Sequence, residues 1–162
     1  MKIKGSIYVG IFLVLLIVGF CREARSEVSI EAGGTWLSGD FADGGMLLMH
    51  ERFGKYSFGI GYVSEQFVST PCGSRRCDFD IRENILIQAQ RELSITDRCR
   101  LGIGPAFFQN TNRALGKRFT IGLMAGCETR GGWGIALRHY SNAGSGTPNL
   151  GQDAILITYR FK

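Results

Sequence analysis

The sequence predicts an all-β protein, an eight-stranded antiparallel up-and-down transmembrane β-barrel. Three observations predict it: apolar residues repeatedly alternate with period two, long and short connections alternate along the chain, and each strand carries large residues on one face and small ones on the other. After residue 26, no stretch keeps a helical period. The fold class therefore depends on strands alone.

The alternation defines eight strands separated by two kinds of connection. The expected strands are residues 28–36, 45–53, 56–62, 79–91, 100–107, 118–126, 133–141 and 154–161. The connections near 37–44, 65–78, 108–117 and 142–152 are long, whereas those near 53–55, 93–97 and 128–132 are short. Outer-membrane barrels have this signature, with long loops at one end and tight turns at the other. An even number of strands places both ends of the barrel segment at the short-turn end.

The composition of the two strand faces indicates which one meets lipid. One face carries large aliphatic and aromatic residues, and the other is mostly Gly, Ala, Ser and Thr with scattered Arg. The interior of an eight-stranded barrel is only wide enough for side chains, which suits the second face. Aromatic residues near strand ends fit interfacial girdles: Trp36, Tyr56, Tyr62, Phe107, Trp133 and Tyr159. A soluble barrel that binds an apolar ligand remains the alternative.

The first 26 residues are expected to be a cleaved secretory signal peptide. A basic start is followed by an apolar run over 7–20, and the small residues Ala24 and Ser26 precede the cleavage point. An uncleaved membrane anchor is the alternative, but the run is shorter than the ~20 residues that a spanning helix needs. Residues 27–162 would then form a single outer-membrane β-barrel domain.

The charge balance gives no indication of nucleic-acid binding. The whole chain has 19 Lys+Arg and 14 Asp+Glu, and removing residues 1–26 leaves 15 basic and 13 acidic residues. The high pI is thus partly a property of the signal segment, and aromatic residues do not interleave with basic ones. We expect no nucleic-acid partner.

Four cysteines remain after the signal: Cys72, Cys77, Cys99 and Cys127. An even number in an exported chain suggests disulfides. A bond between Cys72 and Cys77 would close a small ring in the second long loop. Cys99 begins one strand and Cys127 ends the next, so a symmetric hairpin brings them opposite each other; the alternative is that this pair stays reduced. With only two histidines and this cysteine spacing, we expect neither a metal site nor a cofactor.

The chemistry concentrates on the last two strands. His139 and Ser141 extend the apolar face of one strand, and Asp153 continues the same phase on the next. The mean of 139 and 153 is 146, the middle of the loop, so a symmetric hairpin places Asp153 opposite His139. His139 would then lie between an acid and a hydroxyl, as in a serine hydrolase.

A plainer interpretation competes with this one. A polar residue is common where a barrel strand leaves the lipid, and His-x-Ser often occurs by chance. The chain would then be a small non-enzymatic outer-membrane barrel acting in adhesion or envelope stability through its long loops.

The stretch Arg-His-Tyr-Ser-Asn-Ala-Gly at 138–144, with Pro-Asn at 148–149 and an acid at 153, resembles the C-terminal signature of the outer-membrane lipid A 3-O-deacylases, the PagL family. The resemblance implies hydrolysis of the ester-linked acyl chain at position 3 of lipid A. It also implies the roles of five residues: His139 is the base, Ser141 the nucleophile, Asp153 the acid, and Asn149 and Asn142 lie near the oxyanion.

The resemblance also has implications for partners and location, and the chain departs from the family pattern at two points. It implies lipopolysaccharide and the outer-membrane bilayer as partners. The strand phases place His139, Ser141 and Asp153 on the outside of the barrel at the long-loop end, where they would face the outer leaflet. A backbone N–H near Gly144 is expected as a further oxyanion donor, and Arg75, Arg76 and Arg113 are candidates for pairing with lipid A phosphates. The family's acid is typically Glu, and outer-membrane barrels often end on an aromatic residue, whereas here Lys162 follows Phe161. The sequence leaves acyl-chain preference and oligomeric state open, a homodimer included.

Overall fold

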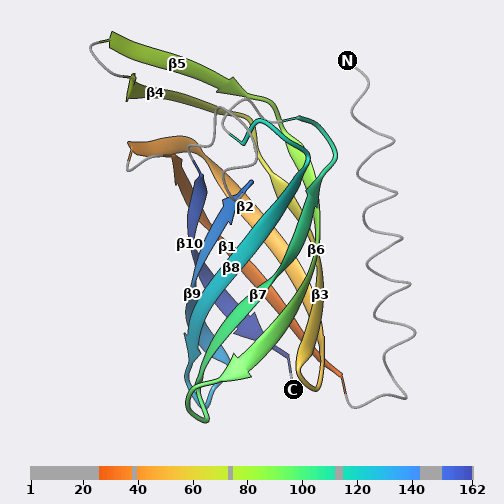
Figure 1. Cartoon of the computed structure of the whole chain (residues 1–162). Helices are drawn as coiled ribbons and strands as arrows, with labels where there is room; N and C mark the ends of the chain where they lie inside the picture. Colours follow the sequence, from red (N-terminus) through yellow and green to blue (C-terminus); the bar gives the residue numbers. More distant parts are fainter. Residues whose placement is uncertain (1–25, 38–39, 73–74, 112–114, 143–150, 162) are drawn as a thin grey trace, which may run out of the picture.

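The computed structural model describes residues 26–37, 40–72, 75–111, 115–142 and 151–161 and shows a closed barrel (Figure 1). Its strands are β1 (Glu27–Leu37), β2 (Asp40–Phe53), β3 (Tyr56–Val63), β6 (Asn84–Ser94), β7 (Cys99–Phe108), β8 (Phe119–Glu128), β9 (Trp133–Ser141) and β10 (Gln152–Arg160). They are joined in the order β1-β10-β9-β8-β7-β6-β3-β2, and all neighbours are antiparallel. The predicted eight-stranded barrel is confirmed.

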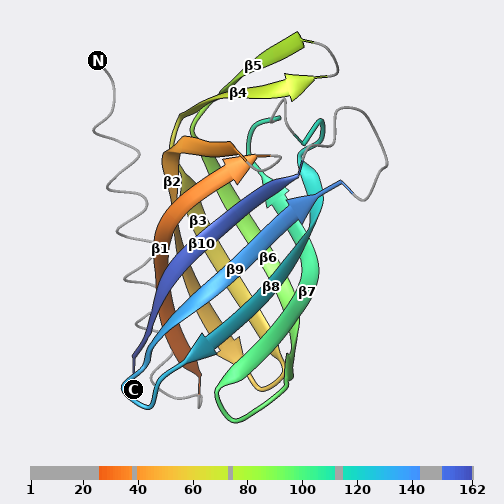
Figure 2. The ribbon, with the colours of Figure 1, turned by 90° about the vertical axis from the view of Figure 1, so that its left-hand side faces the viewer.

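The segment expected as the second long loop is a hairpin in the structure. β4 (Gln66–Cys72) pairs with β5 (Arg75–Ile81) as a separate two-stranded sheet, which projects past the long-loop end of the barrel (Figures 1 and 2). The expected strand 79–91 is therefore wrong as one element, because it is divided between β5 and β6. The division falls at the exposed pair Arg82 and Glu83, where the apolar alternation is interrupted.

The start of β6 is fixed by a side chain. The amide nitrogen of Asn84 donates to the carbonyl of Asn110 at 2.9 Å, and the Asn110 backbone N–H donates to the Asn84 Oδ1 at 2.9 Å. This reciprocal pair joins the first residue of β6 to the segment that follows β7.

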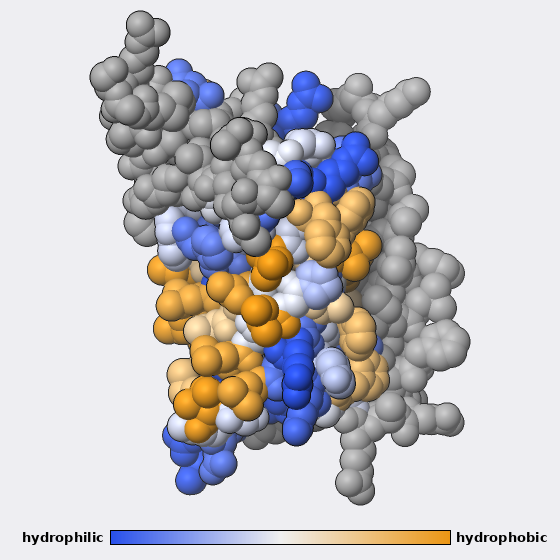
Figure 3. All heavy atoms as spheres, viewed as in Figure 1, coloured by the Kyte–Doolittle hydropathy of each residue, from blue (hydrophilic) through white to orange (hydrophobic). Residues whose placement is uncertain are grey.

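The large apolar residues point out of the barrel, as the sequence predicts. On β10, Ile157 is 60% exposed, whereas its neighbour Leu156 is fully buried. Orange, hydrophobic side chains cover much of the described wall in Figure 3, with blue ones at the lower end and in one strip. At the short-turn end, the rings of Trp133 and Tyr159 lie 4.8 Å apart, as expected for an interfacial girdle.

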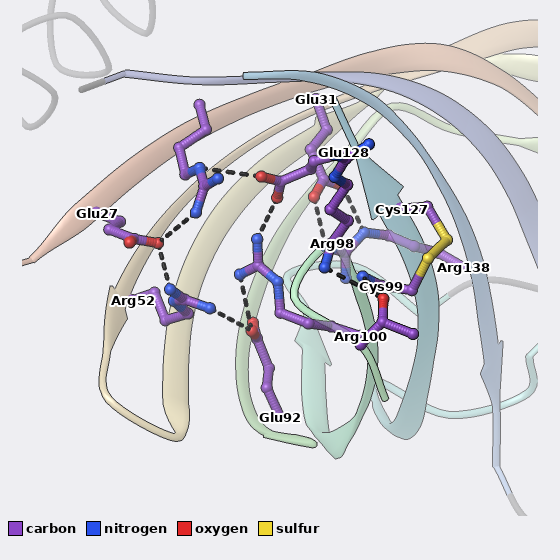
Figure 4. Close-up of polar contacts among 12 residues, drawn as sticks. Glu27, Glu31, Arg52, Glu92, Arg98, Cys99, Arg100, Cys127, Glu128 and Arg138 are labelled. Atoms are coloured by element: carbon purple, nitrogen blue, oxygen red, sulfur yellow. Dashed lines mark hydrogen bonds and ion pairs between the residues drawn. A yellow bond between two sulfur atoms is a disulfide. The ribbon is translucent and has the colours of Figure 1, made fainter. Parts of the chain in front are cut away.

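The lower interior is closed by a ring of alternating charges. It contains three glutamates and three arginines from six strands, in the order Glu27, Arg52, Glu92, Arg100, Glu128 and Arg160, with Arg160 returning to Glu27. Figure 4 shows these contacts spanning the barrel. Arg160 Nη1 lies 3.0 Å from Glu27 Oε2, and Arg100 Nη1 lies 3.4 Å from Glu92 Oε2. Each charge has an opposite charge on both sides, so the ring offsets part of the cost of taking these groups out of water.

A second polar group lies above the ring, around Arg138. Its Nε donates to Glu31 Oε2 at 2.6 Å and its Nη2 to Glu31 Oε1 at 2.8 Å, a bidentate pair. Nη1 donates to Gln90 at 3.1 Å, and Nη2 donates to His50 Nε2 at 3.0 Å. Because a guanidinium can only donate, His50 must accept at Nε2 and is neutral there.

The upper interior contains a buried apolar cluster, which the sequence did not predict. The small and polar face was expected to fill the whole barrel, yet a buried cluster occupies the long-loop end; its members are Met46, Leu48, Val63, Leu86, Ala106, Phe108, Leu115, Tyr140, Ala154 and Leu156. Leu115 comes from the connection between β7 and β8 and is fully buried. A residue from a connecting loop therefore packs in the core at this end of the barrel. The period-two pattern of the strands does not predict this contact.

One of the two expected disulfides is confirmed. Cys99 and Cys127 are directly paired across β7 and β8, and their sulfurs are bonded. The backbones of Cys72 and Cys77 lie on β4 and β5, but their side chains lie outside the described residues. A bond between those two remains a prediction.

The expected signal peptide lies outside the described residues except for Ser26. The division into a signal over 1–26 and one barrel domain over 27–162 therefore stays a prediction. Within the described ranges, no helix is both long and apolar enough to cross a membrane.

Arg138→Met is expected to lower the free energy of unfolding by about 3–5 kcal/mol, because Glu31 would keep a buried charge without its partner. The measurement is denaturant unfolding of the barrel in lipid vesicles. The control is the double variant Arg138→Met, Glu31→Gln, which is expected to recover much of the loss. A double variant as unstable as the sum of the two single changes would contradict the pairing.

Candidate active site

The last two strands bring a histidine and a carboxylate together on the outer wall. Asp153 on β10 is the direct register partner of His139 on β9. His139 Nδ1 lies 2.7 Å from Asp153 Oδ1, within hydrogen-bonding distance. The pairing expected from the symmetric hairpin is present, and the Asp side chain is long enough to reach the ring.

The contact between His139 and Asp153 determines which nitrogen of the imidazole ring can accept a proton. An ionised carboxylate can only accept, so Nδ1 carries the proton and donates it to Asp153. In the neutral ring, Nε2 then has a lone pair and can accept a proton. The two side chains are 41% and 26% exposed, which leaves the pair open to the outer surface of the barrel.

Ser141 lies on the same outer face of β9, two residues beyond His139. It is half-buried and pairs with Ile121 of β8. Residues two apart on a strand are separated by roughly 6.6 Å along it, a distance that two side chains can bridge. Among the described residues, the hydrogen bond of the His139 ring is to Asp153 and not to Ser141.

Gly151 packs against the catalytic candidate His139. Its backbone has φ +72°, a left-handed conformation that favours glycine. A Cβ at this position would lie 2.8 Å from Cε1 of His139. In the sequence, Gly151 lies within the long connection expected near 142–152, and its contact with the imidazole depends on the β9–β10 pairing.

Barrel closure adds a tryptophan to the site. Trp36 on β1 is the direct partner of Asp153, so Trp36, Asp153 and His139 form one row across three strands. The sequence suggested Trp36 only as a girdle residue. The signal that could have found it is the pairing of the first strand with the last, which every closed up-and-down barrel requires.

The other predicted site residues are only partly described. Asn142 is buried, and its amide nitrogen donates to the Leu115 carbonyl at 2.7 Å. Gly144, Asn149 and Arg113 lie outside the described residues, as do the side chains of Arg75 and Arg76. Their expected roles stay predictions.

The second histidine is separate from this site. His50 is buried inside the barrel, whereas His139 points outward. Among the described residues, no group of three or more His, Cys, Asp or Glu side chains is placed to hold a metal ion.

The fold and the site together define a small outer-membrane β-barrel protein with a hydrogen-bonded histidine–aspartate pair on its lipid-facing wall. Residues 85–162, which include this pair and Ser141, match the family model described as lipid A 3-O-deacylase (PagL). This part of the chain therefore belongs to the PagL family, and the resemblance found in the sequence is confirmed. The family supports a lipid A deacylase, a hydrolase, as the activity of the protein.

Solved structures also resemble the chain. One is described as the outer membrane enzyme PagL; it is 20% identical, with 83% of this chain and 98% of that one covered and a TM-score of 0.42. Another is the Yersinia pestis outer membrane protein Ail in a phospholipid bilayer nanodisc; it is 13% identical, with 85% and 100% covered and a TM-score of 0.49. No curated protein sequence matches the chain.

Gly151→Ala is expected to lower lipid A deacylation on the order of 10²-fold, because the added Cβ would displace the His139 ring by a sizeable fraction of an ångström or more. Deacylation is measured by mass spectrometry of lipid A from cells that express the variant. Gly54→Ala is the matched control: Gly54 also has a positive φ of 60°, but a Cβ there meets nothing within 4 Å. Equal losses in both variants would show that backbone strain, and not the ring contact, is responsible.

Proposed function

We propose that the chain is a serine esterase that hydrolyses the ester-linked acyl chain at position 3 of lipid A, in the outer leaflet of the outer membrane. The observation that carries this proposal is the 2.7 Å hydrogen bond between His139 and Asp153 on the outer wall. It leaves Nε2 of His139 as a base beside the outward-facing Ser141. The family match over residues 85–162 supports the substrate class.

The proposed reaction has two halves. His139 Nε2 takes the Ser141 proton as Oγ attacks the ester carbonyl, and Asp153 stabilises the resulting imidazolium. When the tetrahedral intermediate collapses, the C–O bond to the sugar breaks and the imidazolium returns the proton to the leaving hydroxyl. A water molecule, deprotonated by the same ring, then attacks the acyl-serine, releasing the fatty acid and restoring the serine.

The oxyanion needs donors close to Ser141. We assign this role to the side-chain amide of Asn149, with the backbone N–H near Gly144 as a second donor. Asn142 is a weaker candidate, because its amide nitrogen already donates to the Leu115 carbonyl. Losing one such donor typically costs on the order of 10²-fold or more in rate.

The position of the site limits the substrate. His139 and Ser141 lie near the end of β9 that leads into the long connection 142–152, opposite the short-turn end, where β1 begins and β10 ends. Short turns of outer-membrane barrels face the periplasm, so this end meets the outer leaflet. A nucleophile at this position would contact the lipid of the outer leaflet. Lipid A is the acylated sugar lipid in that leaflet. Cationic loop residues such as Arg75, Arg76 and Arg113 would then pair with its phosphates.

The rest of the proposal concerns the mature chain. Residues 1–26 would be removed as a signal peptide, and residues 27–162 would insert as one barrel domain. The proposed chemistry uses side chains and water alone, so it needs no cofactor. It is compatible with a monomer or a homodimer, because all three residues come from one chain.

Ser141→Ala and His139→Ala are each expected to abolish removal of one 3-hydroxyacyl chain from lipid A. Mass spectrometry of lipid A from expressing cells is the measurement, and heat-dependent gel mobility confirms that each variant has folded. Ser94→Ala, a serine at the exposed short-turn end of β6, is the matched control. An unchanged lipid A profile from correctly inserted wild-type protein would instead favour a non-enzymatic barrel.

Asp153→Asn is expected to cost less than Ser141→Ala, by roughly one to two orders of magnitude in rate. The amide cannot stabilise the imidazolium charge, and its NH2 group can donate to Nδ1 and hold the wrong tautomer, but the nucleophile Ser141 and the ring itself remain. Initial rates on purified lipid A in detergent give the ranking. Equal losses from the two variants would contradict it.

A further inference from the structure

The row of outward-facing side chains through His139 is apolar on one side and polar on the other. On β8, the direct partner of His139 is Leu123, which is 42% exposed. On β10 the partner is Asp153, and on β1 the partner of Asp153 is Trp36. The seam where β1 pairs with β10 therefore offers a carboxylate and an indole, which has an apolar face and an N–H donor.

The outer face of β1 is open beside Trp36. Gly34 lies two residues before Trp36 on the same face of the strand, and a Cβ at Gly34 would meet nothing within 4 Å. The ladder between β1 and β2 also shifts its register between Gly34 and Trp36. Irregularities of this kind often re-aim a side chain next to an active site. A partly exposed aromatic side chain thus borders an open stretch of wall at the seam.

The return of the proton restricts where the alcohol part of the ester can lie. In the proposed reaction, His139 gives its proton from Nε2 to the leaving oxygen, which must then lie roughly 3 Å from the ring. The sugar that carries this oxygen is therefore next to His139. A pyranose with its hydroxyls is about 6 Å across, given bonds of about 1.5 Å. The two strand steps from His139 to Trp36 span about 10 Å at ~4.8 Å per step, so one ring fits between these side chains, above Asp153.

The side chains at the seam match the two kinds of surface on a sugar ring. Hydroxyls at the edge of the ring can donate to Asp153, because only Oδ1 is used by His139 and a carboxylate has further lone pairs. The C–H groups on the face of the ring suit the negative face of an indole. On the β8 side, Leu123 has no polar group for the hydroxyls. The seam is therefore the side of His139 that favours a sugar.

We propose that the seam between β1 and β10 is a carbohydrate subsite, in which Trp36 stacks on the pyranose ring that carries the cleaved ester and Gly34 keeps the wall beside the indole open. The inference rests on the proposed function for the identity of the ester, but sugar binding can be measured without turnover. Trp133 is the second of the chain's two tryptophans. It lies at the short-turn end beside Tyr159 and serves as the reference.

The first test compares two esters of the same 3-hydroxy fatty acid in detergent micelles: lipid A and the ethyl ester, which has no sugar. Trp36→Leu is expected to lower the ratio of kcat/KM for lipid A to kcat/KM for the ethyl ester by roughly tenfold, because the lost stacking concerns the sugar alone. Trp133→Leu should leave this ratio as in the wild type. An unchanged ratio in Trp36→Leu, with or without a loss of overall rate, would overturn the subsite.

A steric variant tests the open wall with the indole in place. Gly34→Val meets no clash within the fold, since its Cβ has free space, but its side chain would stand where the sugar lies against the wall. It is expected to lower the same ratio severalfold. Ala32→Val, a similar enlargement on the same face two residues further from Trp36, is the matched control. Equal ratios in these two variants would contradict the role of Gly34.

The second test measures binding alone, in Ser141→Ala proteins that keep one tryptophan each. In the Trp133→Phe background, the emission of Trp36 is expected to shift when lipid A is added to the micelles, but not with phosphatidylglycerol, which is anionic and has no sugar ring. In the Trp36→Phe background, the emission of Trp133 should not distinguish the two lipids.

The outcomes separate the subsite from the esterase. The same response of Trp36 to both lipids would identify it as an interfacial girdle residue and overturn the subsite, even if the wild type hydrolyses lipid A. A response specific to lipid A, without any hydrolysis by the wild type, would support the subsite and refute the esterase.

Discussion

Side chains alternate strictly along a strand, so the residues that point into this barrel determine which residues point out of it. Arg138 and Tyr140 point inward because His139 and Ser141 point outward. The inward pair is strongly held: Arg138 binds Glu31 at 2.6 and 2.8 Å, and the Tyr140 hydroxyl donates to Gln88 at 2.9 Å. A slip of one residue would place a guanidinium in lipid and an imidazole in the core, so these contacts fix the register of β9. The interior network thereby positions the two candidate catalytic groups that it never touches.

The pairing of β10 with β9 and the closure of the barrel by β1 bring the acid and the tryptophan to His139. Asp153 reaches His139 because β10 pairs with β9, and Trp36 reaches Asp153 because β1 closes on β10. The ring of three glutamates and three arginines draws on six strands, including β1 and β10 at that same seam. A bilayer offers no partners for unpaired backbone groups, so an open seam would be costly along its whole length. The row of Trp36, Asp153 and His139 is therefore complete only in the closed barrel.

Much of this architecture could be predicted from the sequence, because a period of two needs only local information. The eight barrel strands, the outward apolar face and the Cys99–Cys127 bond all follow from alternation and hairpin symmetry, and so does the pairing of Asp153 with His139. The β4–β5 hairpin was missed because its polar, turn-rich sequence has the composition of a loop. Leu115 in the buried apolar cluster could not be predicted, because it depends on a contact between segments far apart in the chain. Trp36 beside the acid was missed because its place follows from the pairing of the first strand with the last, whose register local alternation does not provide.

The strand geometry allows an aspartate to reach the ring at the position where the resemblance implies a glutamate. His139 and Asp153 are direct register partners, and a short acid on one strand can reach a ring on the next, as the 2.7 Å contact shows. Gly151 limits the ring from the other side, since even a Cβ would lie 2.8 Å from it. The imidazole is thus held between a carboxylate and a glycine, both carried by the segment that begins β10. A site built on paired strands needs little ordering when substrate arrives, which favours fast chemistry at a membrane surface.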